Sequence, residues 1–143
     1  MKILVINGPN LARLDIRDSS IYGNLNYGEL KNQIETAAKS HGFDADIRQS
    51  DDEATIIGWL HEAADKKYPV IINPAAFTHY SYAIRDAADL LTSPLIEVHL
   101  SNPIAREEFR HTSVISGIAN GTIAGFGPNS YVLAIIALKN LVG

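Results

Sequence analysis

The sequence has 143 residues, of which 46% are hydrophobic and 20% charged, a size and composition typical of a single domain spanning residues 1–143. The absence of cysteine excludes thiol nucleophiles, thiolate zinc sites and iron–sulfur ligation. A net charge of −4 argues against nucleic-acid partners, and no apolar run approaches the roughly 20 residues that a membrane span requires.

Short β-branched runs alternate with helical patterns along the chain. In chain order, the pattern predicts a strand at 3–7, a helix over 30–38, a strand at 45–49, a helix over 56–64, a strand at 70–73, a helix over 81–91, strands at 95–100 and 122–126, and a helix over 129–141. This alternation predicts crossover connections and a flavodoxin-like, doubly wound α/β fold, in which helices cover both faces of a parallel sheet of about five strands.

The first segment of the sequence suggests where the protein is located, and the last segment suggests contact with another subunit. The first apolar run, 3–7, is too short for the core of a signal peptide, so we expect a cytoplasmic protein. The last helix is apolar on all sides from 132 to 138, whereas a surface helix of a small monomer has a polar face. We therefore expect that helix to be buried on two sides, one of them in part by another subunit.

The connection between the first strand and the first long helix covers about twenty residues, where loops of about 2–6 residues are common. Such long loops are often lids or binding loops. This one contains Asn10, Arg13, Arg17 and Tyr22. An arginine beside a tyrosine favours the phenolate, which can act as a general base. The alternative is that Arg17 and Tyr22 are ordinary loop residues with solvated tips.

Polar residues also follow the third and fourth predicted strands, at the sheet edge where ligands of such folds collect. Asn73 and His79 offer donors and acceptors beside small residues, although Asn73 can equally close a turn. Strand alternation puts Glu97 and His99 on one face, where the glutamate can orient the imidazole and keep it protonated as a general acid. A buried polar pair with a purely structural role is the alternative.

Arg106 and Arg110 follow at a spacing of four residues, which places them on one face if the segment is helical. They could hold an anionic or hydroxylated substrate, or they could form a solvated face paired with Glu107 and Glu108. Other chemistries lack their motifs: the chain has neither a G-x-G-x-x-G or Walker loop nor a G-x-S-x-G elbow. All six lysines lie outside these clusters, which argues against a Schiff base.

Together these segments resemble the type II 3-dehydroquinate dehydratases. The resemblance rests on 8–11 with Arg17 and Tyr22-Gly23, on 73–79, and on 97–102 with 106–110, and it runs in order over nearly the whole chain. It implies a cofactor-free and metal-free enzyme of the shikimate pathway that removes water from 3-dehydroquinate to give 3-dehydroshikimate. It also implies a homododecamer built from trimers.

The resemblance assigns a role to each matching residue. It implies that Tyr22 is the base that takes the C2 proton, that Arg17 on the same lid favours its ionised form, and that Asn10 holds a water that stabilises the enolate. His99, supported by Glu97, is then the acid that protonates the leaving C1 hydroxyl. Substrate-binding positions are implied at Asn73, His79, Leu100, Ser101 and Arg110, with Arg106 supporting the base and Asp86 reaching the site of a neighbouring subunit.

The chain departs from the family pattern in the lid, with Asp15 in place of an expected glycine and Ser19 and Ser20 in place of a proline-bearing stretch. Two other functions stay open from the residues alone. His79, Glu97 and His99 with a carboxylate such as Asp86 could serve a metal-dependent hydrolase. A non-catalytic flavodoxin-like module is the second, although a receiver domain would have paired acidic residues after the first strand, where this chain has Asn7-Gly8-Pro9-Asn10.

Overall fold

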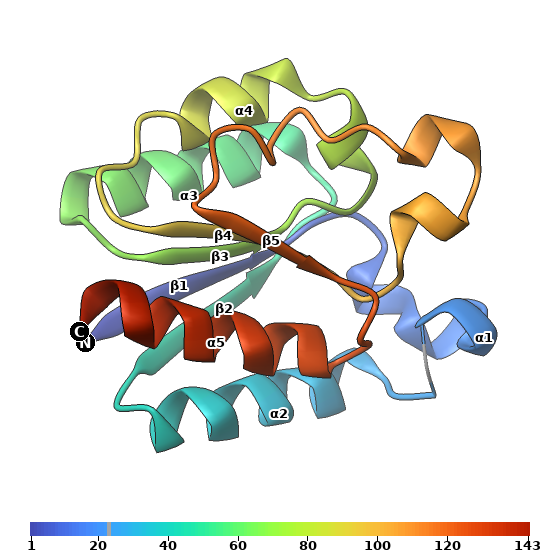
Figure 1. Ribbon diagram of the computed structural model, residues 1–143, viewed down its shortest axis with the longest axis horizontal. Helices are drawn as coiled ribbons and strands as arrows, with labels where there is room; N and C mark the ends of the chain where they lie inside the picture. The colour runs from blue at the N-terminus through green and yellow to red at the C-terminus, as the bar shows by residue number, and fades with distance from the viewer. Residues whose placement is uncertain (23) are drawn as a thin grey trace.

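Five parallel strands form one sheet in the order β2-β1-β3-β4-β5, as seen in a computed structural model that describes residues 1–22 and 24–143. The strands are β1 (Lys2–Asn7), β2 (Asp44–Gln49), β3 (Val70–Asn73), β4 (Leu95–His99) and β5 (Gly121–Ala124). They agree with the predicted strands to within two residues at each end. The prediction of a flavodoxin-like sheet is therefore confirmed (Figure 1).

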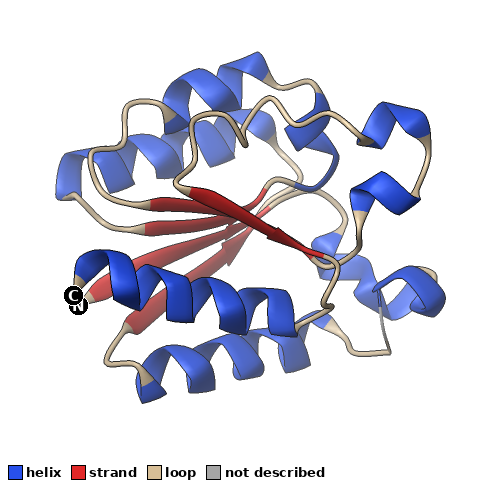
Figure 2. Ribbon diagram, in the orientation of Figure 1, coloured by secondary structure: helices blue, strands red, loops and turns tan. Residues whose placement is uncertain are grey.

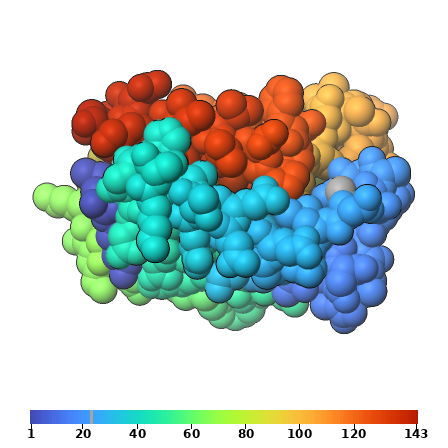
Figure 3. Space-filling view, turned by 90° about the horizontal axis from the view of Figure 1, so that it is seen from below, coloured from blue at the N-terminus to red at the C-terminus, as the bar shows by residue number. Residues whose placement is uncertain are grey.

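Two pairs of helices cover the sheet, one pair on each face (Figure 2). Helices α2 (Tyr27–Ser40) and α5 (Asn129–Val142) pack on one face, where they share a core with residues such as Ile3 and Val98. Helices α3 (Glu53–Lys66) and α4 (Tyr82–Ala88) pack on the other face. Figure 3 shows α2 and α5 side by side over the face that they cover.

Side-chain caps fix the starts of three of these helices. Asn26 accepts a hydrogen bond from the Glu29 N–H at the start of α2, and Asp52 does the same for Thr55 in α3. Ser81 caps α4 through the Ile84 N–H. Each cap satisfies one of the backbone N–H groups that a helix start leaves without a partner, so each helix begins where the sequence supplies such a residue.

Three local predictions need correction, and one residue of an expected motif lies outside the described residues. The predicted helix over 81–91 is shorter, because α4 ends at Ala88. The long connection after β1, expected as a loop, contains the 3-10 helix η1 (Leu11–Ile16) and the helix α1 (Ser19–Tyr22). Arg106 and Arg110 do not share one helix, because the segment forms two 3-10 turns, η3 (Pro103–Ala105) and η4 (Glu108–Arg110). Gly23, part of the Tyr22-Gly23 motif, lies outside the described residues.

The ends of β1 and β3 approach each other closely at Gly8. The Gly8 N–H donates to the Asn73 carbonyl at 2.8 Å, and a Cβ on Gly8 would lie 2.6 Å from the Pro74 carbonyl oxygen. Only glycine fits there, because no real Cβ atom approaches a backbone oxygen so closely. The two strand ends therefore open onto the same edge of the sheet.

A buried polar chain joins these strand ends to α5. The Tyr131 hydroxyl donates to Asn7 Oδ1 at 2.6 Å and accepts from Asn73 Nδ2 at 2.9 Å. Asn7, Asn73 and Tyr131 are all buried, and burial raises the pKa of the Tyr131 hydroxyl, so this group stays neutral. Tyr27 makes a longer contact, with its hydroxyl 3.4 Å from Asn7 Nδ2.

The outward side of α5 is only partly covered in the single chain. Leu133 and Ile136 are each 40% exposed and Leu141 is 50% exposed, whereas Tyr131, Ala134 and Leu138 are buried. The prediction that α5 is buried against its own sheet is confirmed, and the predicted second cover, a neighbouring subunit, is not tested by one chain. Among the described residues, no helix has both the length and the apolar character needed to cross a membrane.

We predict that Tyr131→Phe lowers the free energy of unfolding by about 1–3 kcal/mol, because the amides of Asn7 and Asn73 would lose a buried partner. Tyr27→Phe is the matched control, with a smaller expected loss because its hydrogen bond is long and the ring is only half-buried. Urea unfolding followed by circular dichroism measures the free energy of unfolding of both variants. Equal losses in the two variants would contradict this account of the buried chain.

Candidate active site

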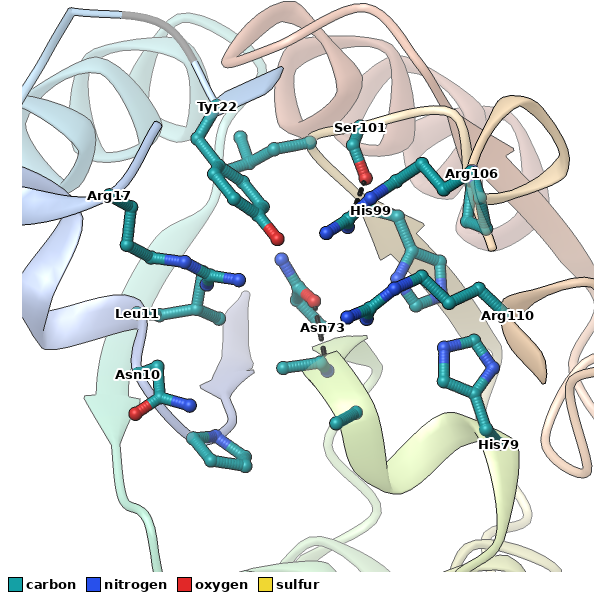
Figure 4. Close-up of a pocket in the computed structure, with 15 residues that line it drawn as sticks. Asn10, Leu11, Arg17, Tyr22, Asn73, His79, His99, Ser101, Arg106 and Arg110 are labelled. Carbon is teal, nitrogen blue, oxygen red and sulfur yellow. Dashed lines mark hydrogen bonds between the residues drawn. The ribbon is translucent and has the colours of Figure 1, made fainter. Parts of the chain in front are cut away.

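A pocket of about 120 Å³ opens at the carboxyl ends of β1, β3 and β4 (Figure 4). It is lined by Pro9, Asn10, Leu11, Arg17, Tyr22, Asn73, Ala75, Ala76, His79, His99, Leu100, Ser101, Pro103, Arg106 and Arg110. Three arginines line it, and among the lining residues that the structure describes there is no Asp or Glu. The pocket is therefore suited to an anionic, hydroxylated ligand.

Tyr22 reaches this pocket from the short helix α1. Its side chain is buried, and its hydroxyl points into the pocket between Arg17 and Asn73 (Figure 4). The Arg17 guanidinium lies over the Tyr22 ring at 3.6 Å from the centroid, and the Arg106 guanidinium lies 5.1 Å from the same centroid. Two cationic side chains therefore lie beside the Tyr22 ring at the edge of the pocket.

The positive charges of the arginines in the pocket also affect the pKa of Arg17. Burial lowers the pKa of Arg17, the ionised form of Tyr22 opposes that change, and the charges of Arg106 and Arg110 lower it further. Arg106 donates from Nη1 to Ser101 Oγ at 3.2 Å, but its Nε is buried and has no hydrogen-bond partner within the described part of the chain. A bound anion would both relieve the repulsion and supply the missing acceptor.

The backbone is strained at two of the lining residues. Asn10 has φ = 69° and Ala75 has φ = 52°, in the left-handed region that residues with a Cβ seldom adopt. Ala75 is held there in part by Asn73 Oδ1, which accepts its N–H at 3.1 Å. Asn10 is held by Asp51 Oδ1, which accepts its N–H at 2.9 Å. Such strain commonly concentrates where a backbone must present groups to a ligand.

The Glu97–His99 pair from β4 borders the pocket on another side. His99 Nε2 lies 2.5 Å from Glu97 Oε2, and the Glu97 side chain has no exposed surface. Burial by itself raises the pKa of Glu97, but hydrogen bonds from His99, Ser116 and Thr78 and the charge of His99 outweigh it and leave that pKa below its usual value. The glutamate carboxylate thereby orients the imidazole ring. The expected pairing of these residues on one strand face is confirmed.

The structure brings nearly all of the expected site residues together. Asn10, Arg17, Tyr22, Asn73, His79, His99, Leu100, Ser101, Arg106 and Arg110 all line the pocket, and Glu97 lies directly behind His99. Arg13 points elsewhere and pairs with Asp15 at 3.1 Å on the surface. Asp86 lies on α4 outside the pocket of its own chain, with its side chain 76% exposed and paired with Arg85.

Sequence reasoning missed four polar residues around the site. Thr78, Ser113 and Ser116 hydrogen-bond to Glu97, and Tyr131 holds Asn73. Thr78 lies inside the 73–79 motif but carried no signal of its own. The two serines lie in an irregular segment without periodicity, and Tyr131 is one aromatic residue in an apolar helix.

A metal centre finds no support in the side-chain arrangement. Within residues 1–22 and 24–143, no three His, Asp or Glu side chains are grouped to hold a metal ion. His79 Nδ1 instead lies 2.8 Å from the Thr112 carbonyl oxygen, and His99 is engaged with Glu97. The pocket thus offers acid–base groups and cationic donors from the chain itself.

Comparisons with known proteins identify the family. The family model described as "Dehydroquinase class II" matches residues 1–139. The 3-dehydroquinate dehydratase of Mycobacteroides abscessus is 53% identical over 135 residues, covering 94% of each chain.

Solved structures agree with the sequence relatives. The type II dehydroquinase from Propionibacterium acnes superposes with a TM-score of 0.95 at 49% identity, covering 97% of this chain and 96% of that one. The type II dehydroquinase from Butyrivibrio crossotus superposes with a TM-score of 0.91 at 48% identity, covering 97% of both chains. With a family model that spans almost its whole length and relatives near 50% identity, this chain belongs to the class II dehydroquinase family.

Proposed function

We propose that this chain is a type II 3-dehydroquinate dehydratase, a hydro-lyase that converts 3-dehydroquinate to 3-dehydroshikimate in the shikimate pathway. One observation carries the proposal: Tyr22 with two arginines and His99 with Glu97 border the same cationic pocket. Elimination of water from a β-hydroxy ketone needs a base, a group that stabilises the enolate and an acid, and this pocket offers a candidate for each.

The reaction proceeds in two proton-transfer steps. The Tyr22 phenolate takes a proton from C2, next to the ketone, and leaves an enolate. Asn10 holds the water that donates a hydrogen bond to the enolate oxygen. The enolate then re-forms the ketone as the C1–O bond breaks, and the protonated His99 gives its proton to the departing hydroxyl, which leaves as water. The chain supplies both proton-transfer groups, so the step needs no cofactor.

Other pocket residues bind the substrate in this proposal. The backbone N–H groups of Leu100 and Ser101 bind the carboxylate, and Asn73, His79 and Arg110 make the further contacts with the substrate. Arg106 supports the tyrosine, to whose ring it lies close. In this proposal residues 1–143 act as one catalytic domain, working in the cytoplasm.

We also propose that the active form is a homododecamer built from trimers. The uncovered apolar side chains of α5 favour further burial, and Tyr80 and Tyr82 are 59% and 69% exposed near the start of α4. Asp86, exposed on the same helix, then reaches the site of a neighbouring subunit and faces its arginines.

We expect sedimentation equilibrium to give a mass twelve times that of one chain.

We predict that Tyr22→Phe and His99→Ala each lower kcat by about 10²–10⁴-fold, because each removes a proton-transfer group. The rate of formation of the conjugated enone is followed by its ultraviolet absorbance, with purified protein and 3-dehydroquinate. Chelator and borohydride leave the wild-type rate unchanged, since neither a metal ion nor a Schiff base takes part. A folded wild-type protein without turnover would overturn the enzymatic assignment in favour of a binding module.

Subunit complementation tests the shared site. Tyr22→Phe and Asp86→Ala are each expected to be nearly inactive alone. Mixed oligomers of the two regain up to roughly one quarter of the wild-type rate, because some sites then combine an intact Tyr22 with an intact Asp86 from the neighbour. Mixtures of Tyr22→Phe with His99→Ala serve as the control and regain nothing, because both residues belong to the pocket of one chain. Equal results in the two mixtures would exclude the shared site.

A further inference from the structure

The Glu97 carboxylate accepts hydrogen bonds from three hydroxyl groups in addition to the imidazole. Thr78 Oγ1 donates to Oε2 at 2.5 Å, and Ser116 Oγ donates to Oε1 at 2.6 Å. Ser113 Oγ lies 2.9 Å from Oε1 and 3.1 Å from Oε2. These hydroxyls come from η2 (Ala75–His79) and from the segment between η4 and β5, so two separate parts of the chain converge on one carboxylate.

Other hydrogen bonds orient the two serine hydroxyls toward Glu97. Ser113 Oγ already accepts the N–H groups of Ile115 and Ser116 at 3.1 and 3.0 Å, so its proton points away from them. The acceptors on that side are the Glu97 carboxylate and Thr78 Oγ1, which lies 3.0 Å from Ser113 Oγ and itself donates to Glu97. Ser116 Oγ accepts from Thr122 Oγ1 at 3.1 Å, which leaves its own proton for Glu97.

The groups around Glu97 are hydrogen-bond donors, and such groups suit an ionised carboxylate rather than a carboxylic acid. A neutral Glu97 would need an acceptor for its own proton, and the three hydroxyls and the imidazole N–H offer it donors. The hydrogen bonds also fix the plane of the carboxylate, so that Oε2 stays aligned with His99 Nε2. Other charged or titratable groups near this cluster are His79, Arg110 and His111, which line a cavity of about 150 Å³ beside it.

We propose that Thr78, Ser113 and Ser116 are positioning residues that hold the Glu97 carboxylate ionised and aligned, and so keep His99 ready as the acid of the elimination. This inference rests on the proposed function for its kinetic consequence, because only there does His99 give up a proton. The arrangement of hydrogen-bond donors around Glu97 does not depend on that function, because it is argued from the hydrogen bonds alone.

The kinetic test compares variants with and without the hydroxyl. Thr78→Val and Ser116→Ala each lower kcat by about tenfold, the rate equivalent of one lost hydrogen bond to a charged group, with KM little changed. The basic limb of the kcat–pH profile moves, because the loss of a donor changes both the basicity and the alignment of the carboxylate that faces the imidazole. Thr78→Ser keeps the hydroxyl and restores both kcat and the profile.

A matched control separates positioning from stability. Ser81 donates to Glu53 in a similar hydroxyl–carboxylate pair, which is partly buried and lies outside the pocket. Ser81→Ala is therefore expected to lower the unfolding midpoint without moving the basic limb. If Thr78→Val and Ser116→Ala act only as Ser81→Ala does, with lower stability and an unchanged pH profile, the positioning role is overturned.

Proton NMR tests the cluster without turnover. The short Glu97–His99 hydrogen bond gives a downfield ring N–H resonance, identified by its loss in His99→Ala. Thr78→Val shifts or broadens this resonance, and Thr78→Ser leaves it in place. An unchanged resonance in Thr78→Val overturns the proposal. If the wild-type chain fails to convert 3-dehydroquinate, the proposed function fails, and this resonance alone decides whether the hydroxyls position the pair.

Discussion

Parallel pairing of β1, β3 and β4 is the constraint on which the rest of this molecule depends. Because the strands run in one direction, Asn7, Asn73 and His99 end at one edge, although 92 residues separate the first from the last. The close approach at Gly8 keeps β1 and β3 in register there. Tyr131 then links the two strand ends to α5 through buried hydrogen bonds. These hydrogen bonds give the buried polar side chains of Asn7, Asn73 and Tyr131 partners and tie the strand ends together.

Groups of opposite charge stand on the two sides of the pocket. Tyr22 has the guanidinium groups of Arg17 and Arg106 beside its ring. His99 instead has the buried carboxylate of Glu97 as its hydrogen-bond partner. The proposed mechanism uses these surroundings, since neighbouring cations stabilise an anion and a neighbouring anion stabilises a cation. Burial strengthens such interactions, because water screens them less.

The proposed base and the proposed acid lie on elements of different character. His99 ends a central strand, and Glu97 on the same strand is surrounded by hydroxyl donors, so several hydrogen bonds hold the proposed acid in place. Tyr22 lies on a helix of four residues within a long connection. Asp15, Ser19 and Ser20, which depart from the family pattern, are exposed there; Asp15 accepts from Arg13 and Ser20 donates to Asp18. None of the three lines the pocket.

Sequence by itself determined the order of strands and helices and most of the pocket. Periodicity and β-branched runs located all five strands, and alternation along β4 put Glu97 and His99 on one face, since these signals depend on local spacing. Only the tertiary structure decided which residues complete the site. Thr78, Ser113 and Ser116 come together around Glu97, and Tyr131 meets Asn73 from 58 residues away, through contacts that no local pattern encodes. Local periodicity reports which face a residue lies on, whereas its partner across the sheet is set by packing.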